Sequence, residues 1–158
     1  MSERFEKATA LIRRYSYWSA GFGLIPVPVI DLAAITATQI KMVRDLAGIY
    51  ERQFSEEMVR ASIGALVGAA LPVAVGSGTV SAIKTVPIIG QVAGTLLLPA
   101  LAAASTIAVG RVFTQHFEAG GTLLDFDPEK MKAHFEAEFK KAKDGSTSEA
   151  ADEAKAVA

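Results

Sequence analysis

The chain has 158 residues, of which 51% are hydrophobic and 21% charged, and its formal net charge is -1. This length predicts one domain, or one domain with a tail, and the balanced charge gives no electrostatic reason to expect a nucleic-acid partner. The absence of cysteine excludes disulfides, thiolate metal sites and cysteine nucleophiles.

A first amphipathic helix is predicted over residues 3–22. Apolar side chains recur there at helical spacing, and most of the charged ones fall between them. Gly21 and Gly23 predict the end of this helix. Acidic and basic residues precede any apolar run, so the beginning of the chain is not typical of a cleaved secretory signal.

A second helix is predicted from Val29 to about Phe54. Pro26 and Pro28 each restrict the residue before them, which favours an extended or kinked segment ahead of this helix. Asp31 falls in its first turn, where a carboxylate can cap exposed N–H groups and meet the positive end of the helix dipole.

The segment 61–110 contains a single charged side chain, that of Lys84. A third helix is predicted to begin near Ser55, a capping residue followed by two glutamates, and to run into this segment. As helices, residues 61–83 and 85–110 would be about 34 and 39 Å long, against about 30 Å for the hydrocarbon core of a bilayer. Each is therefore long enough to span a membrane.

Turn and breaker residues interrupt the apolar segment near its middle. They include Gly76, Gly78, Lys84 and Pro87. We therefore predict a helical hairpin over residues 61–110 with Lys84 at or near its tip.

Two interpretations of this hairpin remain open, because a helix that is apolar on all sides is either a core helix or a membrane span. The bilayer is favoured, since the rest of the chain is too short to cover so many uncharged residues in water. Gly64 and Gly68, like Gly90 and Gly94, form G-x-x-x-G patterns that let helices approach closely in lipid and predict self-association.

The orientation of an inserted hairpin follows from its flanking charges. Fifteen of the 16 Lys and Arg residues lie outside the segment 61–110, so both termini are expected on the cytoplasmic side. Lys84 would then mark the far turn; in a soluble bundle it would simply solvate a loop. The sequence does not separate a spanning hairpin from one that enters a single leaflet.

The end of the chain is predicted to hold one more helix. Gly120 and Gly121 end the preceding helix, and Asp127 followed by Pro128 is typical of an N-cap with proline at the first helical position. This helix, about 128–143, should dock on the bundle through apolar residues that recur every four positions. Residues 144–158 are small and polar and are expected to form a disordered tail.

The predicted fold is all-α, a helical bundle built around the long Gly/Ala-rich hairpin with amphipathic helices beside it. Residues 1–143 form a single domain, and no segment has the pattern of a strand.

The sequence PVPVIDLAAITATQIKMVRDLAGIY resembles the signature of domain-of-unknown-function family 697. Weaker matches follow around Ile83 and in STIAVGRVFTQHF, so the resemblance covers roughly residues 20–118. The signature positions are Pro26, Pro28, Asp31, Gln39, Met42, Tyr50, Ile83, Lys84, Pro87, Gly90, Thr106 and Gly110. Members of this family are bacterial helical domains thought to associate with membranes and often linked to Era-like GTPases. The resemblance implies no catalytic activity or cofactor.

This chain has no G-x-x-x-x-G-K-[ST] phosphate loop, so a GTPase partner would have to act in trans. Its two histidines, His116 and His134, lie on different predicted helices and do not form a metal or catalytic motif.

A few polar groups have apolar surroundings in the sequence: Asp31, Gln39, Lys84 and Gln91. In a membrane such residues often carry function, but a cap or a turn explains Asp31 and Lys84 equally well. A channel built on these residues is a weaker hypothesis.

The sequence as a whole predicts a small non-enzymatic protein of the bacterial inner membrane, without cofactor or metal. Its expected partners are membrane lipid, further copies of itself and a GTPase, and its expected role is scaffolding or membrane remodelling. The alternative is a cytoplasmic, soluble homo-oligomeric bundle that buries the hairpin between subunits.

Overall fold

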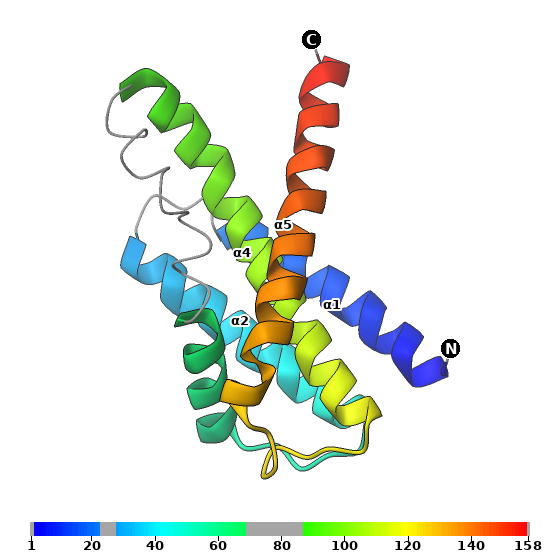
Figure 1. Cartoon of the computed structure of the whole chain (residues 1–158). Helices are drawn as coiled ribbons and strands as arrows, with labels where there is room; N and C mark the ends of the chain where they lie inside the picture. Colours follow the sequence, from blue (N-terminus) through cyan, green and yellow to red (C-terminus); the bar gives the residue numbers. More distant parts are fainter. Residues whose placement is uncertain (1, 23–27, 69–86, 158) are drawn as a thin grey trace.

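The computed structural model describes residues 2–22, 28–68 and 87–157, and all of its regular elements are α-helices (Figure 1). The helices are α1 (Glu3–Phe22), α2 (Pro28–Ile49), a helix at residues 56–68, α4 (Pro87–Glu118) and α5 (Pro128–Val157). Within these described ranges there is no strand. The predicted all-α class is confirmed.

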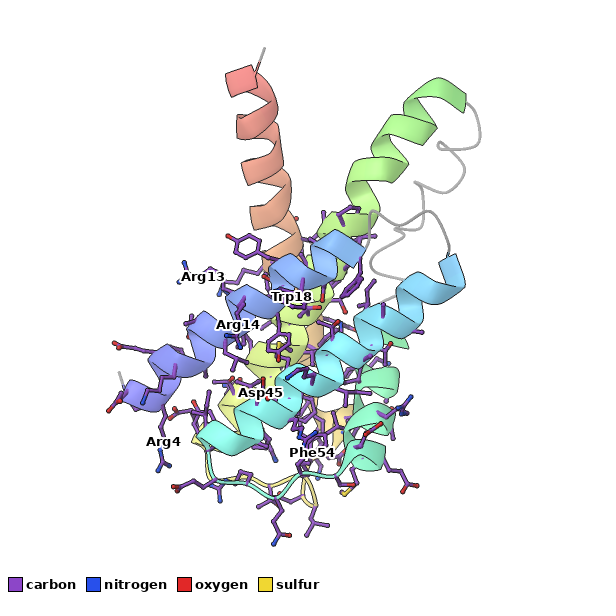
Figure 2. All side chains as sticks on the ribbon, turned by 180° about the vertical axis from the view of Figure 1, so that it is seen from behind. Arg4, Arg13, Arg14, Trp18, Asp45 and Phe54 are labelled. Carbon is purple, nitrogen blue, oxygen red and sulfur yellow. The ribbon has the colours of Figure 1, made fainter. Side chains whose placement is uncertain are left out.

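Helix α4 is the central element of the bundle. It packs against α1, α2 and α5, whereas α5 packs on α4 and not on α1 or α2 among the described residues. The two opposite views agree, because α5 crosses in front of α4 in Figure 1 while α1 and α2 lie in front in Figure 2. The pair α1 and α2 therefore covers one side of α4, and α5 covers the other.

Contacts far apart in the sequence set the directions of these helices. Arg4 and Tyr15 of α1 reach Glu51 and Asp45, so α1 and α2 are antiparallel. Ser2 bonds Glu118 at the opposite end of the chain, which makes α1 antiparallel to α4 as well.

The predicted helix starts at Ser55 and Asp127 are confirmed. The Ser55 hydroxyl accepts the N–H of Met58 at 3.5 Å, and the Asp127 carboxylate accepts the N–H of Glu129 at 3.1 Å. Both residues satisfy backbone donors that the first turn of a helix leaves free. Pro128 follows as the first residue of α5, where its missing N–H costs nothing.

Helix α4 ends near the predicted glycines. Gly120 has φ +89° and donates to the Phe117 carbonyl, and Gly121 donates to the His116 carbonyl. This pair of bonds is a Schellman cap, in which the first residue after the helix takes the left-handed conformation that glycine adopts easily.

Helix α2 ends at Ile49, about one turn before the predicted end near Phe54. The same cap closes it: Arg52 donates to the Ala47 carbonyl, Glu51 donates to the Gly48 carbonyl, and Glu51 has φ 55°. A glutamate in the left-handed region is uncommon. Because position 51 is not a glycine, nothing in the sequence indicated that the helix ends here. The predicted boundary was wrong for that reason.

Helix α5 is longer than predicted, because it continues through residues 144–157 to Val157. The expectation of a disordered tail is corrected here. Alanine, which has the highest helix propensity, is the commonest residue of this segment, and that preference outweighed its lack of large apolar side chains.

Aromatic residues of α4 and α5 fill the centre of the core. Phe113, Phe117 and Phe135 are fully buried, and Phe113 stacks on Phe126 with ring centroids 4.4 Å apart. Phe135 and Phe139 are buried as the predicted docking face of α5 requires. Burying one such ring is worth roughly 1.5–3 kcal/mol, so the helix contacts of α4 carry much of the stability.

The predicted hairpin over residues 61–110 is described only in its outer parts, the helix at 56–68 and α4. Its tip, including Lys84, lies outside the described residues, so the structure identifies no long apolar hairpin. None of the helices in the described part of the chain combines the length and the apolar composition that crossing a membrane requires.

Candidate functional site

A buried polar cluster joins three helices through two of the signature residues. The side-chain amide of Gln39 on α2 donates to Ser105 Oγ at 3.0 Å and to Thr106 Oγ1 at 3.2 Å. Thr106 in turn donates to Ser19 Oγ of α1 at 2.7 Å. All four side chains are buried, and bonds made away from water fix how α1, α2 and α4 sit against one another.

The sequence singled out Gln39 and Thr106 but missed Ser19 and Ser105. Gln39 and Thr106 are 67 positions apart, so their contact is a property of the folded bundle. Both missed residues are serines inside apolar helical stretches. A polar side chain in such a stretch is expected to be buried and to need a hydrogen-bond partner, and that expectation could have identified them.

Gly110 marks the closest approach of α1 and α4. A Cβ placed on Gly110 would lie 2.6 Å from Ile12 Cγ1, far inside van der Waals contact. Glycine is required there because the Ile12 side chain occupies the space that any other residue would need. This gives a packing reason for the glycine of the sequence signature.

Tyr50, the signature tyrosine, ties α2 to the end of α4. It is 5% exposed, and its hydroxyl donates to Glu118 Oε1 at 2.7 Å. Burial, and then the bond to Glu118, raises the pKa of Tyr50. The hydroxyls of Tyr50 and Ser2 both stabilise the carboxylate and hold the pKa of Glu118 below its ordinary value.

Charged side chains of α1, α2 and α4 stop at one level of the bundle, which we call the charge boundary. It is defined by Arg14, Lys41 and Arg111. The Arg14 guanidinium lies 5.5 Å and the Lys41 ammonium 5.9 Å from the centre of the Tyr15 ring. Arg111 directly follows Gly110, which packs on Ile12 one turn below Tyr15. The three cations therefore lie at similar height.

The charge boundary divides α1, α2, the helix at residues 56–68 and α4 into two ends. Helix α5 passes the boundary, because Glu138 meets Arg111 and the helix continues to Val157 at the same end of the molecule as the start of α4 (Figure 1). The uncharged end comprises residues 15–22, 28–40, 61–68 and 87–110, and its sequence carries one charged residue, Asp31. The charged end comprises residues 2–14, 41–60 and 111–138, and every ion pair of the described residues involves at least one residue of this end. The buried cluster around Gln39 lies in the uncharged end.

Tyr15 connects α1 to α2 at the charge boundary. Its hydroxyl donates to Asp45 Oδ2 at 2.6 Å, and Lys41 pairs with the same carboxylate at 3.6 Å. Burial, followed by the hydrogen bond to Asp45, raises the pKa of Tyr15. The bond to Tyr15 and the charge of Asp45 raise the pKa of Lys41, so this group stays cationic at neutral pH.

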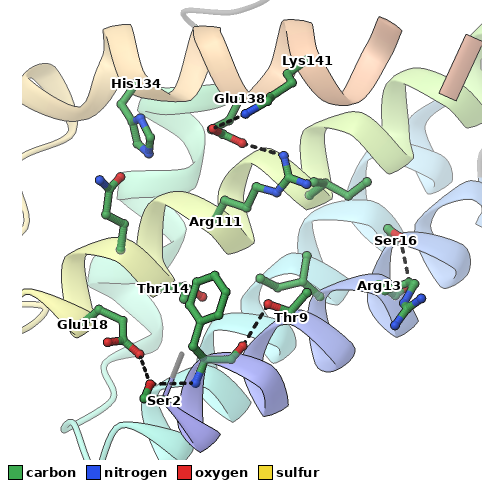
Figure 3. A pocket seen from close by; sticks show the side chains of 14 residues that line it. Ser2, Thr9, Arg13, Ser16, Arg111, Thr114, Glu118, His134, Glu138 and Lys141 are labelled. Atoms are coloured by element: carbon green, nitrogen blue, oxygen red, sulfur yellow. Dashed lines mark hydrogen bonds and ion pairs between the residues drawn. The ribbon is translucent and has the colours of Figure 1, made fainter. Parts of the chain in front are cut away.

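A groove of about 1100 Å³ runs over α4 between α1 and α5 (Figure 3). It exists because α1 and α5 both pack on α4 without packing on each other. Arg111 crosses it to Glu138 with an N–O distance of 2.7 Å, and Lys141 approaches the same carboxylate at 3.9 Å. The paired charges leave a mixed surface without a strong preference for an anion or a cation.

Thr114 is the one groove-lining residue with a buried hydroxyl that lacks a hydrogen-bond partner in the described part of the chain. An unpaired buried hydroxyl costs on the order of 1–3 kcal/mol.

The predicted packing glycines have different surroundings. Gly64 and Gly68 are exposed, and a Cβ at either would meet nothing within 4 Å, so they pack no helix inside this chain. Gly90 and Gly94 lie on α4, but their surroundings are outside the described residues. Self-association through these glycines stays a prediction.

For the remaining predicted site residues, the structure describes either the backbone alone or nothing. Pro28 and Pro87 are the first residues of α2 and α4, and Asp31 and Gln91 lie within those helices, but the side chains of these four residues are not described. Pro26 lies outside the described residues, as Lys84 does.

The histidines have structural surroundings. The ring of His116 donates from Nε2 to the Thr122 carbonyl at 2.8 Å, closing the loop after α4. His134 lies on the wall of the groove. Within residues 2–22, 28–68 and 87–157, no three His, Asp or Glu side chains gather closely enough to hold a metal ion.

An all-α bundle with a charged end, an uncharged end and a buried amide–hydroxyl cluster within the uncharged end defines a class of helical domain. The chain belongs to the family described as Domain of unknown function (DUF697), whose family model matches residues 1–144. The resemblance in the sequence signature is thereby confirmed, over a longer part of the chain than the signature alone covered.

One curated relative carries a descriptive name. The chain is 34% identical over 137 residues to Magnetosome membrane protein 22 of Magnetospirillum gryphiswaldense (strain DSM 6361 / JCM 21280 / NBRC 15271 / MSR-1). The similarity covers 86% of this chain and 70% of the relative. No solved structure matches the chain.

Proposed function

We propose that this protein is a non-enzymatic, membrane-associated helical domain that enters the bacterial inner membrane with its uncharged end. The charge boundary is the observation that carries the proposal. Apart from Asp31 near the start of α2, three helices lose their charges at one level, although the last charged residues, Arg14, Lys41 and Arg111, are far apart in the sequence. A protein folded wholly in water has no reason to align these positions, whereas a membrane surface imposes such a plane.

Two further findings support membrane association. The relative at 34% identity is named a magnetosome membrane protein. In addition, the first 24 residues of α4, 87–110, carry no charged side chain, although a helix long and apolar enough to cross the bilayer is not found among the described residues. The N-terminus lies in the charged end, and both termini are proposed to be cytoplasmic because 15 of the 16 Lys and Arg residues lie outside residues 61–110.

The proposed role is scaffolding or membrane remodelling by self-association, coupled to a GTPase acting in trans. Gly64 and Gly68 support the self-association, because both are exposed on one helix four positions apart and no part of the described chain covers them. Small residues at this spacing let helices of two copies approach closely in lipid.

Cell fractionation with an alkaline carbonate wash tests the membrane proposal. Retention of the full-length protein in the washed membrane pellet, with release by detergent, is expected. Recovery in the soluble fraction as a defined oligomer would instead favour the alternative, a cytoplasmic bundle that buries residues 61–110 between subunits.

Substitution of the exposed glycines tests self-association. The double variant Gly64→Leu/Gly68→Leu is expected to lower the assembly size in detergent, since leucines hold the helices apart. The matched control is Ala133→Leu/Ala137→Leu, which adds the same two side chains at the same spacing on the exposed side of α5. An unchanged assembly size in the glycine variant would contradict packing through these glycines.

A further inference from the structure

We propose that one exposed turn of α1, formed by Arg13, Arg14, Tyr17 and Trp18, binds the surface of an anionic phospholipid bilayer. In this arrangement the two guanidinium groups contact lipid phosphates and the two rings lie at headgroup level. The inference rests on the proposed membrane association and assigns the residues that set the depth and the lipid preference.

The exposure of the two aromatic side chains is the first observation. Tyr17 is 70% and Trp18 63% exposed, although both follow directly on the buried Tyr15 and Ser16. Their rings gain nothing from the core, so packing within the chain does not explain them. Tyr and Trp have an apolar ring and a polar group, and they collect where a membrane meets water.

The unpaired arginines are the second observation. Among the described residues neither Arg13 nor Arg14 forms an ion pair, although both are exposed one turn from the aromatic side chains. Figure 2 shows both arginines and Trp18 along α1. A guanidinium presents several N–H donors in a plane and suits phosphate oxygens.

The position of the turn is the third observation. Arg14 belongs to the charge boundary, and the next sixteen residues along the chain, 15–30, contain no charged side chain. The cations therefore lie on the charged side of the boundary and the rings on the uncharged side, which is the order that a membrane interface requires.

The opposite side of the molecule gives a consistent orientation. Helix α5 lies across α4 from α1, and its last part, residues 144–157, carries four acidic residues against one basic residue. An anionic surface would repel this segment, so its charge disfavours binding through α5 and favours binding through α1. Charge complementarity thus selects an anionic bilayer as the occupant of the α1 surface.

Trp18 is the only tryptophan in the chain, so its fluorescence reports this surface directly. The full-length protein is mixed with, or reconstituted into, vesicles of equal parts phosphatidylglycerol and phosphatidylcholine, and with vesicles of phosphatidylcholine alone. With the anionic vesicles, Trp18 emission is expected to move to shorter wavelength. Lipids brominated near the carbonyl end of the acyl chain should quench it more than lipids brominated near the chain terminus.

The variant Arg13→Gln/Arg14→Gln tests the phosphate contacts. It is expected to need about 10- to 30-fold more anionic lipid for the same shift of Trp18 emission, since each basic residue near an anionic surface contributes about a factor of five. The control Lys132→Gln/Lys140→Gln removes two exposed cations from α5 and should leave the titration unchanged. An equal loss in both variants would overturn the assignment to α1.

Flotation of the same vesicles separates this inference from the proposed function. If the protein floats with the lipid while Trp18 keeps its aqueous emission, the α1 surface does not contact the bilayer, and the inference fails although the membrane association stands. Strongest quenching by deep bromines would overturn the placement at headgroup level. A protein that never floats removes the proposed function and the inference together.

Discussion

The two ends of this bundle are held together by different chemistry. In the charged end, stacked rings such as Phe113 and Phe126 fill the core, and ion pairs cover the surface. In the uncharged end, the described interior combines aliphatic side chains such as Ile63 and Leu66, and alanines, with the hydroxyl and amide groups bonded to Gln39. The difference indicates that aromatic packing stabilises one end, while aliphatic packing and polar bonds between helices position the other.

The largest expected effect is the loss of an aromatic ring from the charged end. Phe113→Ala should lower the free energy of unfolding by about 3–5 kcal/mol, because it removes a fully buried ring and leaves a cavity. Urea denaturation of the protein measures this change. Leu124→Ala, at a side chain that is 83% exposed, is the control and should change stability by less than about 0.5 kcal/mol. Similar losses in both variants would contradict a core centred on Phe113.

The next effect is expected at the charge boundary. Gly110→Ala places a methyl group against Ile12 and should destabilise the fold by about 1–3 kcal/mol, because the β-branched side chain cannot move aside easily. Gly64→Ala, where a Cβ meets nothing, should instead stabilise its helix by about 0.5–1 kcal/mol. The same denaturation measurement applies, and stabilisation by both alanines would show that α1 and α4 are not in close contact.

A smaller effect is expected from the polar cluster of the uncharged end. Gln39→Met keeps the approximate size of the side chain but removes the amide, so the expected loss is about 1–2 kcal/mol. Thr38→Val is the matched control, since the Thr38 hydroxyl bonds only the Ala34 carbonyl of its own helix. If the two variants behave alike, the bonds to Ser105 and Thr106 do not position α2 against α4.

The smallest effect concerns the pH dependence of the charged end. The folded-state pKa of Glu118 is lowered, so its contribution to stability is present above the unfolded-state pKa and is lost as the pH falls through the folded-state value. Tyr50→Phe removes the largest cause and should raise the Glu118 pKa toward its ordinary value. An NMR titration of the Glu118 carboxyl group measures the shift, and Tyr17→Phe, at an exposed ring, should leave it unchanged. An unmoved midpoint in Tyr50→Phe would contradict the bond.

Local sequence signals predicted much of the secondary structure. Ser55 and Asp127 mark helix starts because a side-chain oxygen can satisfy the free N–H groups of a first turn. Gly120 marks a helix end because glycine adopts positive φ without strain. Where the same cap uses Glu51, no local signal exists, and the predicted end of α2 was too late.

The amino-acid sequence by itself determined the all-α class, most helix boundaries, the family signature and the segment 61–110, in which Lys84 is the single charged residue. Each depends on residues within a few positions of one another, or on composition alone. Only the tertiary structure decided that Gln39 meets Thr106, that Gly110 faces Ile12, and that the charges of α1, α2 and α4 end at one level. These features depend on how far each helix slides along its neighbour, and that register is set by packing between side chains distant in the sequence.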